Sequence, residues 1–116
     1  MLFIEYPKCS TCKKALKYLR DNNIEVTTRD IVTDTPTKEE LINWMDKSGV
    51  EPRKFFNTCG KVYKELGLKD KVKDMSKEEM AEILSTNGML IKRPLLISDK
   101  EVLLGFKEEA YIRVKQ

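Results

Sequence analysis

The chain has 116 residues, of which 41% are hydrophobic, so we expect one domain with one core. Its 22 Lys and Arg residues nearly balance its 19 Asp and Glu residues, and the formal charge of +3 argues against direct nucleic-acid binding. No apolar stretch approaches the roughly 20 residues of a membrane span or forms a secretory signal. We therefore expect a cytoplasmic protein that does not contact a membrane.

The sequence contains no histidine, which excludes Ser-His and Cys-His nucleophile pairs and the His-Glu-x-x-His metal motif. A four-coordinate zinc site built on Cys9, Cys12 and Cys59 would need a carboxylate or a second chain, so we expect no bound metal. Three cysteines without a secretory signal also fit poorly with a disulfide scaffold. They indicate redox chemistry or simple packing.

The first thirty or so residues predict a βαβ unit. Residues 2–6 are rich in strand-forming side chains and are interrupted by Pro7, so we predict a strand and a tight connection. Apolar side chains recur at helical spacing from Thr11 until residues 21–23. The β-branched residues within 24–32 indicate a second strand, and a crossover of this kind should be right-handed.

Residues 37–87 are predicted to be entirely helical. Thr37 with Glu40, and Ser76 with Glu79, match the capping box in which side chains satisfy the free amides at a helix start. Apolar residues keep helical spacing between these two points.

The last quarter of the chain predicts a second pair of strands. Residues 89–98 are typical of an approach to a strand, residues 99–100 of a hairpin turn, and residues 102–104 of the partner strand. A terminal helix is expected over 107–114. The assembled order is βαβ, a helical insertion at 37–87, ββ and α. It predicts a single α/β domain over 1–116 with a thioredoxin-like (glutaredoxin-like) fold, a four-stranded mixed sheet.

Cys9 and Cys12 are the candidate reactive residues. Amides at a helix N-terminus favour a thiolate over a thiol, and Cys9 is predicted to lie there. Cys12, three residues later, can reach Cys9 and release a mixed disulfide. Lys8, Lys13 and Lys14 should lower the Cys9 pKa further. We therefore predict Cys9 as nucleophile and Cys12 as resolving thiol; the alternative is a pair of inert, buried cysteines.

Arg93 is the third candidate. It precedes Pro94, which opens the third strand through either an ordinary or a cis peptide bond. If that strand lies beside the cysteine loop, the guanidinium could hold a thiolate, an oxidised sulfur or an oxyanion. The alternative is a surface ion pair.

Other conspicuous side chains favour packing over chemistry. Cys59 lies outside any metal or redox spacing and is expected to be a small buried hydrophobe. The aromatic residues of the helical block are expected in the core; they are Trp44, Phe55, Phe56 and Tyr63.

Four segments carry a resemblance to a known family: YPKCSTCKKA (6–15), FFNTCGKVY (55–63), IKRPLL (91–96) and LGF (104–106). They span nearly the whole chain. In these segments the sequence resembles the arsenate reductase (ArsC) and Spx family of bacterial thioredoxin-like proteins.

The resemblance implies roles for two of the candidate residues. Cys9 aligns with the nucleophile of arsenate reductases, and Arg93 with an arginine that helps hold the oxyanion or the reactive sulfur. Asn57 and Gly105 stand where further arginines are implied, which argues against arsenate itself. We expect no bound cofactor, with glutathione, another small thiol, thioredoxin or glutaredoxin as co-substrate.

The Spx branch suggests a different function, because it shares a C-x-x-C motif at the position of Cys9 and Cys12. The resemblance then implies a redox-controlled regulator that binds the C-terminal domain of the RNA polymerase α subunit, and Gly49 lies in the comparable contact region. A third hypothesis is a protein with inert thiols, whose pKa would stay near 8.5. In each case we expect a monomer.

Overall fold

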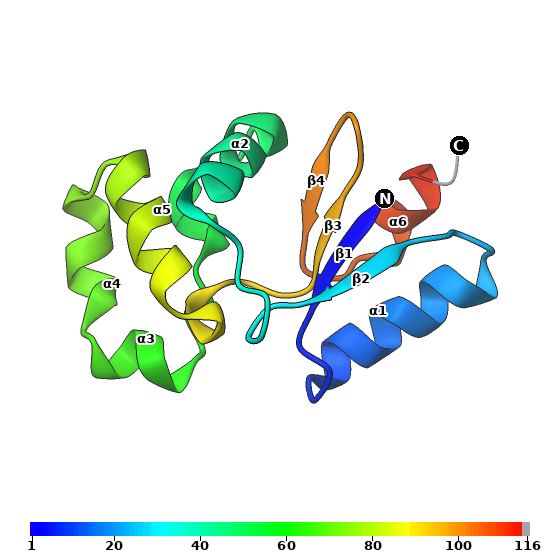
Figure 1. The fold of residues 1–116 in the computed structure, drawn as a ribbon, viewed down its shortest axis with the longest axis horizontal. Coiled ribbons are helices and arrows are strands. Elements are labelled where there is room, and N and C mark those ends of the chain that lie inside the picture. The colour runs from blue at the N-terminus through cyan, green and yellow to red at the C-terminus, as the bar shows by residue number, and fades with distance from the viewer. Residues whose placement is uncertain (115–116) are drawn as a thin grey trace.

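The computed structural model describes residues 1–114 and contains a four-stranded sheet with helices on both faces (Figure 1). Strand β1 (Leu2–Glu5), helix α1 (Ser10–Asp21) and strand β2 (Thr27–Asp30) form the first unit, in which the two strands are parallel. The predicted βαβ unit is confirmed.

The second half of the sheet is an antiparallel hairpin. Strands β3 (Leu95–Ile97) and β4 (Val102–Leu104) pair with each other, and β3 pairs antiparallel with β1. The resulting order is β2-β1-β3-β4, and helix α6 (Glu108–Val114) follows β4. This is the predicted mixed sheet of a thioredoxin-like fold.

The segment between β2 and β3 is the predicted helical insertion. It contains α2 (Lys38–Ser48), the 3-10 helix η1 (Pro52–Phe55), α3 (Lys61–Glu65), α4 (Leu68–Lys71), η2 (Val72–Asp74), α5 (Lys77–Thr86) and η3 (Gly88–Leu90). Both predicted capping boxes are present. The hydroxyls of Thr37 and Ser76 each accept a hydrogen bond, 3.1 Å long, from the amide three residues later.

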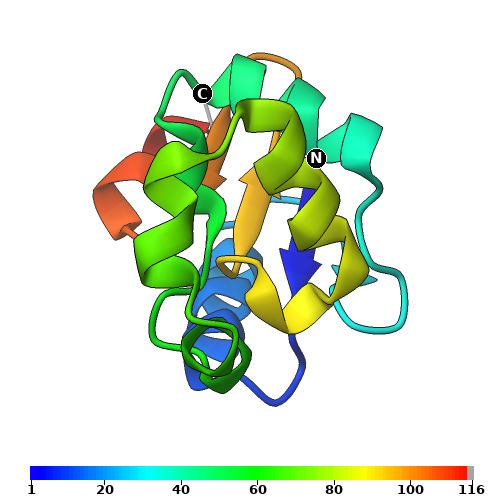
Figure 2. The same cartoon turned by 90° about the vertical axis from the view of Figure 1, so that its left-hand side faces the viewer.

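The sheet separates the buried side chains into two clusters, where one core was expected. Phe3 and Leu96 point to the face covered by α1 and α6. Ile4 and Leu95, their chain neighbours, point to the opposite face, which the insertion covers (Figure 2). The two layers follow from the alternation of side chains along a strand.

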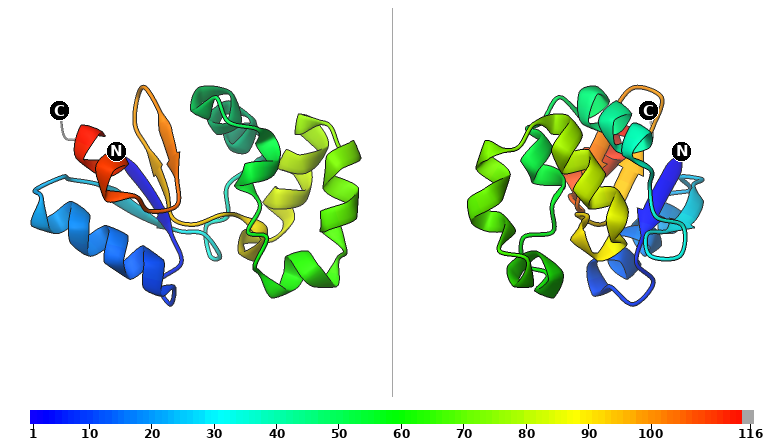
Figure 3. Two further views of the ribbon diagram at one scale, coloured as in Figure 1. Left: turned by 180° about the vertical axis from the view of Figure 1, so that it is seen from behind. Right: turned by 60° about the vertical axis from the view of Figure 1, so that its left-hand side comes forward.

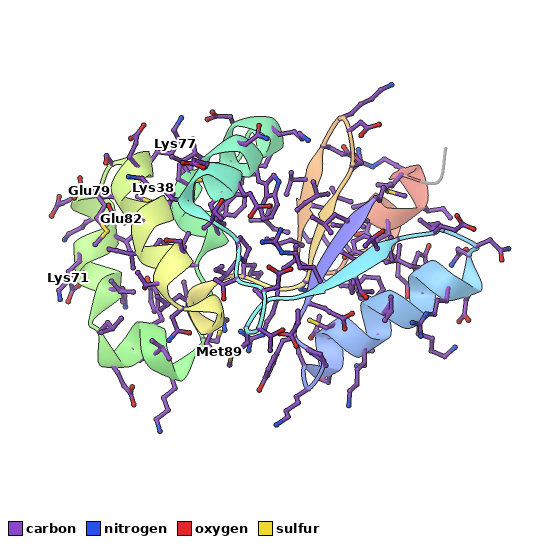
Figure 4. All side chains as sticks on the ribbon, viewed as in Figure 1. Lys38, Lys71, Lys77, Glu79, Glu82 and Met89 are labelled. Atoms are coloured by element: carbon purple, nitrogen blue, oxygen red, sulfur yellow. The ribbon has the colours of Figure 1, made fainter. Side chains whose placement is uncertain are left out.

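Ion pairs connect the insertion to the sheet and hold its helices together. The guanidinium of Arg29 on β2 donates two hydrogen bonds, 2.7 and 2.9 Å long, to the carboxylate of Glu40 on α2. Its Nε also donates to the carbonyl of Asp34 at 2.9 Å. Lys38 of α2 and Glu82 of α5 pair at 3.6 Å on the outer surface (Figure 4). The Arg29 contacts fix the position of α2 where the chain leaves β2, and the Lys38–Glu82 pair joins α2 to α5.

Three local predictions need correction. Strand β2 ends at Asp30 because its carboxylate accepts hydrogen bonds from the amides of Val32 and Thr33, which turns the chain. The segment 89–91, expected to approach a strand, is partly the 3-10 helix η3. Cys59 is exposed instead of buried, because it lies in the turn before α3.

The predicted packing of the aromatic residues is confirmed. Trp44, Phe55, Phe56 and Tyr63 are all buried in the cluster beneath the insertion. Within residues 1–114, none of the helices has the length and apolar character needed to cross a membrane.

Candidate functional site

Cys9 occupies the N-cap position of α1. A turn after β1 brings it there, and the Cys9 amide donates a 2.9 Å hydrogen bond to the Tyr6 carbonyl. Its backbone is extended, with φ −83° and ψ 125°, and its carbonyl accepts the first helical hydrogen bond, 3.1 Å long, from the Lys13 amide. The side chain is half-buried, so the sulfur lies at the helix start and within reach of solvent.

Cys12 lies one turn further along α1, beneath Cys9. Its exposed fraction is 0%, and its sulfur accepts a 3.5 Å hydrogen bond from the Tyr6 amide. The two cysteines therefore differ in access, since Cys9 can meet a partner from solution whereas Cys12 cannot.

The environment of Cys9 favours its thiolate. Partial burial raises the pKa of this thiol, but the Cys12 amide and thiol, the Thr11 amide and the Arg93 guanidinium lower it by more. The net effect is a Cys9 pKa below that of an ordinary thiol. These groups are all hydrogen-bond donors, so they stabilise the negatively charged form of Cys9.

The environment of Cys12 has the opposite effect. Burial is the main cause that raises its pKa to about 12, and the neighbouring Cys9 sulfur adds to the increase. The two environments therefore favour a protonated Cys12 that donates a hydrogen bond to a Cys9 thiolate.

Arg93 lies beside the two cysteines. Its guanidinium carbon is 5.1 Å from the centre of the Tyr6 ring, a cation–π distance. Its Nε and Nη1 atoms are buried and have no hydrogen-bond partner within residues 1–114. The peptide bond to Pro94 is cis. The structure thus brings together Cys9, Cys12 and Arg93, and it leaves two donors of Arg93 free for an anion.

The lysines that were expected to lower the Cys9 pKa are not among the main causes of its shift. Lys8, Lys13 and Lys14 are exposed, and none is among the causes of the lowered Cys9 pKa. Water screens such flexible charges, whereas backbone amides and a half-buried guanidinium are fixed in place.

Tyr6 is the residue that the sequence analysis missed. Its amide, its carbonyl and its ring contact Cys12, Cys9 and Arg93, respectively. Its position three residues before the first cysteine, between a strand and Pro7, is the signal that could have indicated it.

Two positions where the family resemblance implies arginines have other roles here. The Gly105 amide donates a 2.8 Å hydrogen bond to the Pro94 carbonyl, and its positive φ of 76° suits glycine. The Asn57 amide donates a 2.7 Å hydrogen bond to the Leu90 carbonyl. Neither side chain supplies a cation to the site. In residues 1–114, the potential metal ligands His, Cys, Asp and Glu form no cluster of three or more.

Comparison with known proteins gives a consistent picture. The model of the ArsC family matches residues 4–114. A solved structure of an ArsC family related protein from Bacteroides fragilis is 53% identical, with a TM-score of 0.94, and the match covers 97% of this chain and 95% of that one. A protein from Streptococcus mutans, described as a possible arsenate reductase, is 44% identical, with a TM-score of 0.85 and coverage of 91% and 90%.

Two further relatives differ in what their names say. The uncharacterized protein YusI of Bacillus subtilis is 46% identical over 111 residues, which are 96% of this chain and 94% of YusI. The global transcriptional regulator Spx of Streptococcus agalactiae is 27% identical over 103 residues, which are 89% of this chain and 74% of Spx.

Proposed function

Because the chain belongs to the ArsC family, we propose that it is a thiol-dependent reductase in which Cys9 is the nucleophile and Cys12 the resolving thiol. One observation carries the proposal. A reachable sulfur with a lowered pKa lies beside a buried sulfur with a raised pKa. A nucleophile must be charged and accessible, and a resolving thiol must be close but protected from competing partners.

The first step uses the Cys9 thiolate. It attacks one sulfur of a substrate disulfide, so that a bond forms between Cys9 and that sulfur and the other sulfur leaves as a thiolate, which takes a proton from water. The product is a mixed disulfide on Cys9. Arg93 supports this step by holding the attacking sulfur as an anion, since its cationic donors face it.

The second step uses Cys12. Once Cys9 is bonded, its negative charge no longer raises the Cys12 pKa, so Cys12 loses its proton more readily. The Cys12 thiolate attacks the Cys9 sulfur and a Cys9–Cys12 disulfide forms. The bound sulfur leaves as a thiolate, which takes up the proton that Cys12 has lost. Two equivalents of a reducing thiol then restore both cysteines and are themselves oxidised to a disulfide.

The physiological reductant is a small thiol such as glutathione, or a protein such as thioredoxin or glutaredoxin. This chemistry requires a reducing compartment, which fits a protein that works in the cytoplasm. Arsenate is a poor candidate substrate, because the site offers one arginine and an oxyanion needs several fixed donors.

Turnover of hydroxyethyl disulfide with each reductant tests the proposal, and arsenate is assayed in parallel. Cys9→Ser should abolish turnover of the disulfide. Cys12→Ser should retain the first step and accumulate a mixed disulfide that mass spectrometry detects. Cys59→Ser is the matched control, because this cysteine is exposed in a turn outside the pair, and it should behave like the wild type. Turnover that survives in Cys9→Ser would exclude the proposed nucleophile.

A second candidate function is supported by the Spx relatives. In that case the Cys9–Cys12 disulfide would change the affinity for the C-terminal domain of the RNA polymerase α subunit. A pull-down of the polymerase by oxidised and reduced protein tests it. Absence of the polymerase under both conditions would rule this function out.

A further inference from the structure

A basic groove runs along the free edge of β4. It has a volume of about 1330 Å³ and lies between the helical insertion and α6, the two elements that flank β4 in Figure 3. Each of the residues 101–105, which include all of β4, lines the groove. Cys9, Cys12 and Arg93 do not line it, although Lys92 and Gly105 at one end of the groove adjoin Arg93 and Pro94.

The edge of β4 offers unpaired backbone groups to this groove. The Ser98 amide donates a hydrogen bond to the Glu101 carbonyl, and the Gly105 amide donates one to the Pro94 carbonyl. These bonds show which residue pairs of the β3–β4 hairpin are hydrogen-bonded. In an antiparallel ladder such pairs alternate with pairs whose N–H and C=O groups point away from the partner strand. The backbone groups of residues 102 and 104 therefore point outward. β4 is the last strand in the order β2-β1-β3-β4, so no other strand within residues 1–114 pairs with these groups.

The side chains of β4 do not block the edge. Val102 is buried and Leu104 half-buried against the insertion, so neither covers the outward backbone groups. An extended peptide could thus add to the edge without displacing any part of the core.

The walls of the groove are positively charged. The lysines that line it are exposed, come from both of its sides, and make no ion pair with a carboxylate of residues 1–114; they are Lys54, Lys69, Lys73, Lys92 and Lys107. Arg53 also lines the groove but is paired with Glu51 at 2.7 Å. Among residues 1–114, the carboxylates that line it are those of Glu101 and Glu109.

We propose that this groove binds an extended acidic segment of a partner protein, which pairs with β4 as a fifth strand. Outward N–H and C=O groups select an extended backbone, and the lysines select carboxylates. A second copy of this chain would bring two basic grooves together, so charge disfavours it as occupant. The site does not depend on the redox chemistry of Cys9.

A seven-residue peptide that alternates Glu and Val, labelled for fluorescence anisotropy, is the probe. It should bind the wild type, and its lysine counterpart should not. Binding should also slow hydrogen exchange of the Val102 and Leu104 amides. Cys9→Ser should bind the peptide as the wild type does, which separates this proposal from the proposed function.

Two variants test the two parts of the site. Leu104→Pro removes one outward N–H and leaves the ladder to β3 intact, and it should weaken binding about three- to tenfold. Lys69→Glu/Lys73→Glu should weaken it about tenfold or more. The matched control is Lys13→Glu/Lys14→Glu on α1, which changes the net charge equally outside the groove and should have a smaller effect.

Three results would overturn the proposal. One is equal loss of affinity in the two charge-reversed variants, and another is unchanged exchange of the Val102 and Leu104 amides in the complex. The third is stronger binding of an oligothymidylate of the same charge, since the site would then recognise an anionic polymer and not a strand. The charge variants decide the question even if Leu104→Pro fails to fold.

Discussion

The Arg93 guanidinium lies 5.1 Å above the Tyr6 ring, and Tyr6 also holds both cysteines through its backbone. The ring restricts a long, flexible side chain to one region of space, where its guanidinium acts on the Cys9 sulfur. Within residues 1–114, no carboxylate pairs with Arg93. Because the Tyr6 ring positions Arg93 without neutralising it, the positive charge of Arg93 remains available to the Cys9 thiolate.

Replacement of Arg93 should therefore raise the pKa of Cys9. In Arg93→Met, loss of the cationic donor destabilises the thiolate, and turnover should fall roughly tenfold or more. The pH dependence of iodoacetamide alkylation gives the pKa directly. Lys92→Met is the matched control, because Lys92 is exposed and does not affect Cys9. An unchanged alkylation profile in Arg93→Met would show that Arg93 does not act on the sulfur.

The two cysteines should react in opposite ways with alkylating reagents. Cys9, with a lowered pKa, should be modified at neutral pH, whereas buried Cys12, with a pKa of about 12, should react only after unfolding. Peptide mass spectrometry of native and urea-unfolded samples measures both. Equal modification of both cysteines in the native protein would contradict this arrangement.

The raised pKa of Cys12 also links stability to pH. The unfolded thiol ionises near 9.0 but the folded one only near 12, so the free energy of unfolding should fall as pH rises through this range. Cys12→Ala should reduce that fall. Urea unfolding between pH 8 and about 11 measures it, with Cys59→Ala, which alters an exposed thiol, as the control.

The Arg29–Glu40 pair should stabilise the joint between sheet and insertion in a pH-dependent way. Hydrogen bonds from Arg29 lower the Glu40 pKa from 4.5 to about 2, so this contribution is present above pH 4.5 and is lost as pH falls toward 2. The Glu40 side chain is 36% exposed, and solvent screening limits the coupling to about 1 kcal/mol. Urea unfolding of Arg29→Met, Glu40→Gln and the double variant measures it. Glu39→Gln, at an exposed neighbour, should show no coupling to Arg29→Met.

Replacement of Gly88, even by alanine, should destabilise the protein. A Cβ at this position would collide with the Ile31 carbonyl oxygen, so Gly88→Ala should destabilise the protein by about 1–3 kcal/mol through a forced backbone shift. Gly49→Ala is the comparison, because its Cβ would meet no atom within 4 Å and only the left-handed backbone, φ 71°, is unfavourable. Thermal unfolding should rank Gly88→Ala as the more damaging change.

The features that could be predicted from sequence are those encoded locally. The capping boxes at Thr37 and Ser76 involve residues three apart, and the helix that places Cys9 at its N-terminus is encoded by apolar spacing. The prediction that Cys59 is buried is wrong, because the burial of a turn depends on which element packs over it, and no local sequence pattern carries that information.

The interactions at the site could not be predicted because they cross the fold. Tyr6 and Arg93 are far apart in sequence and meet only because β1 and β3 are adjacent in the sheet. The neighbouring lysines were overestimated for the same reason, since sequence proximity shows charge but not whether that charge is fixed near a sulfur.

The difference in access between Cys9 and Cys12 has a kinetic consequence. Because Cys9 carries the reachable sulfur of the pair, the oxidising substrate and the reducing thiol must react in turn at the same atom. Double-reciprocal plots of initial rates should then show the parallel lines of a ping-pong mechanism. Each substrate in excess should inhibit, because it binds the oxidation state of the protein with which the other substrate reacts.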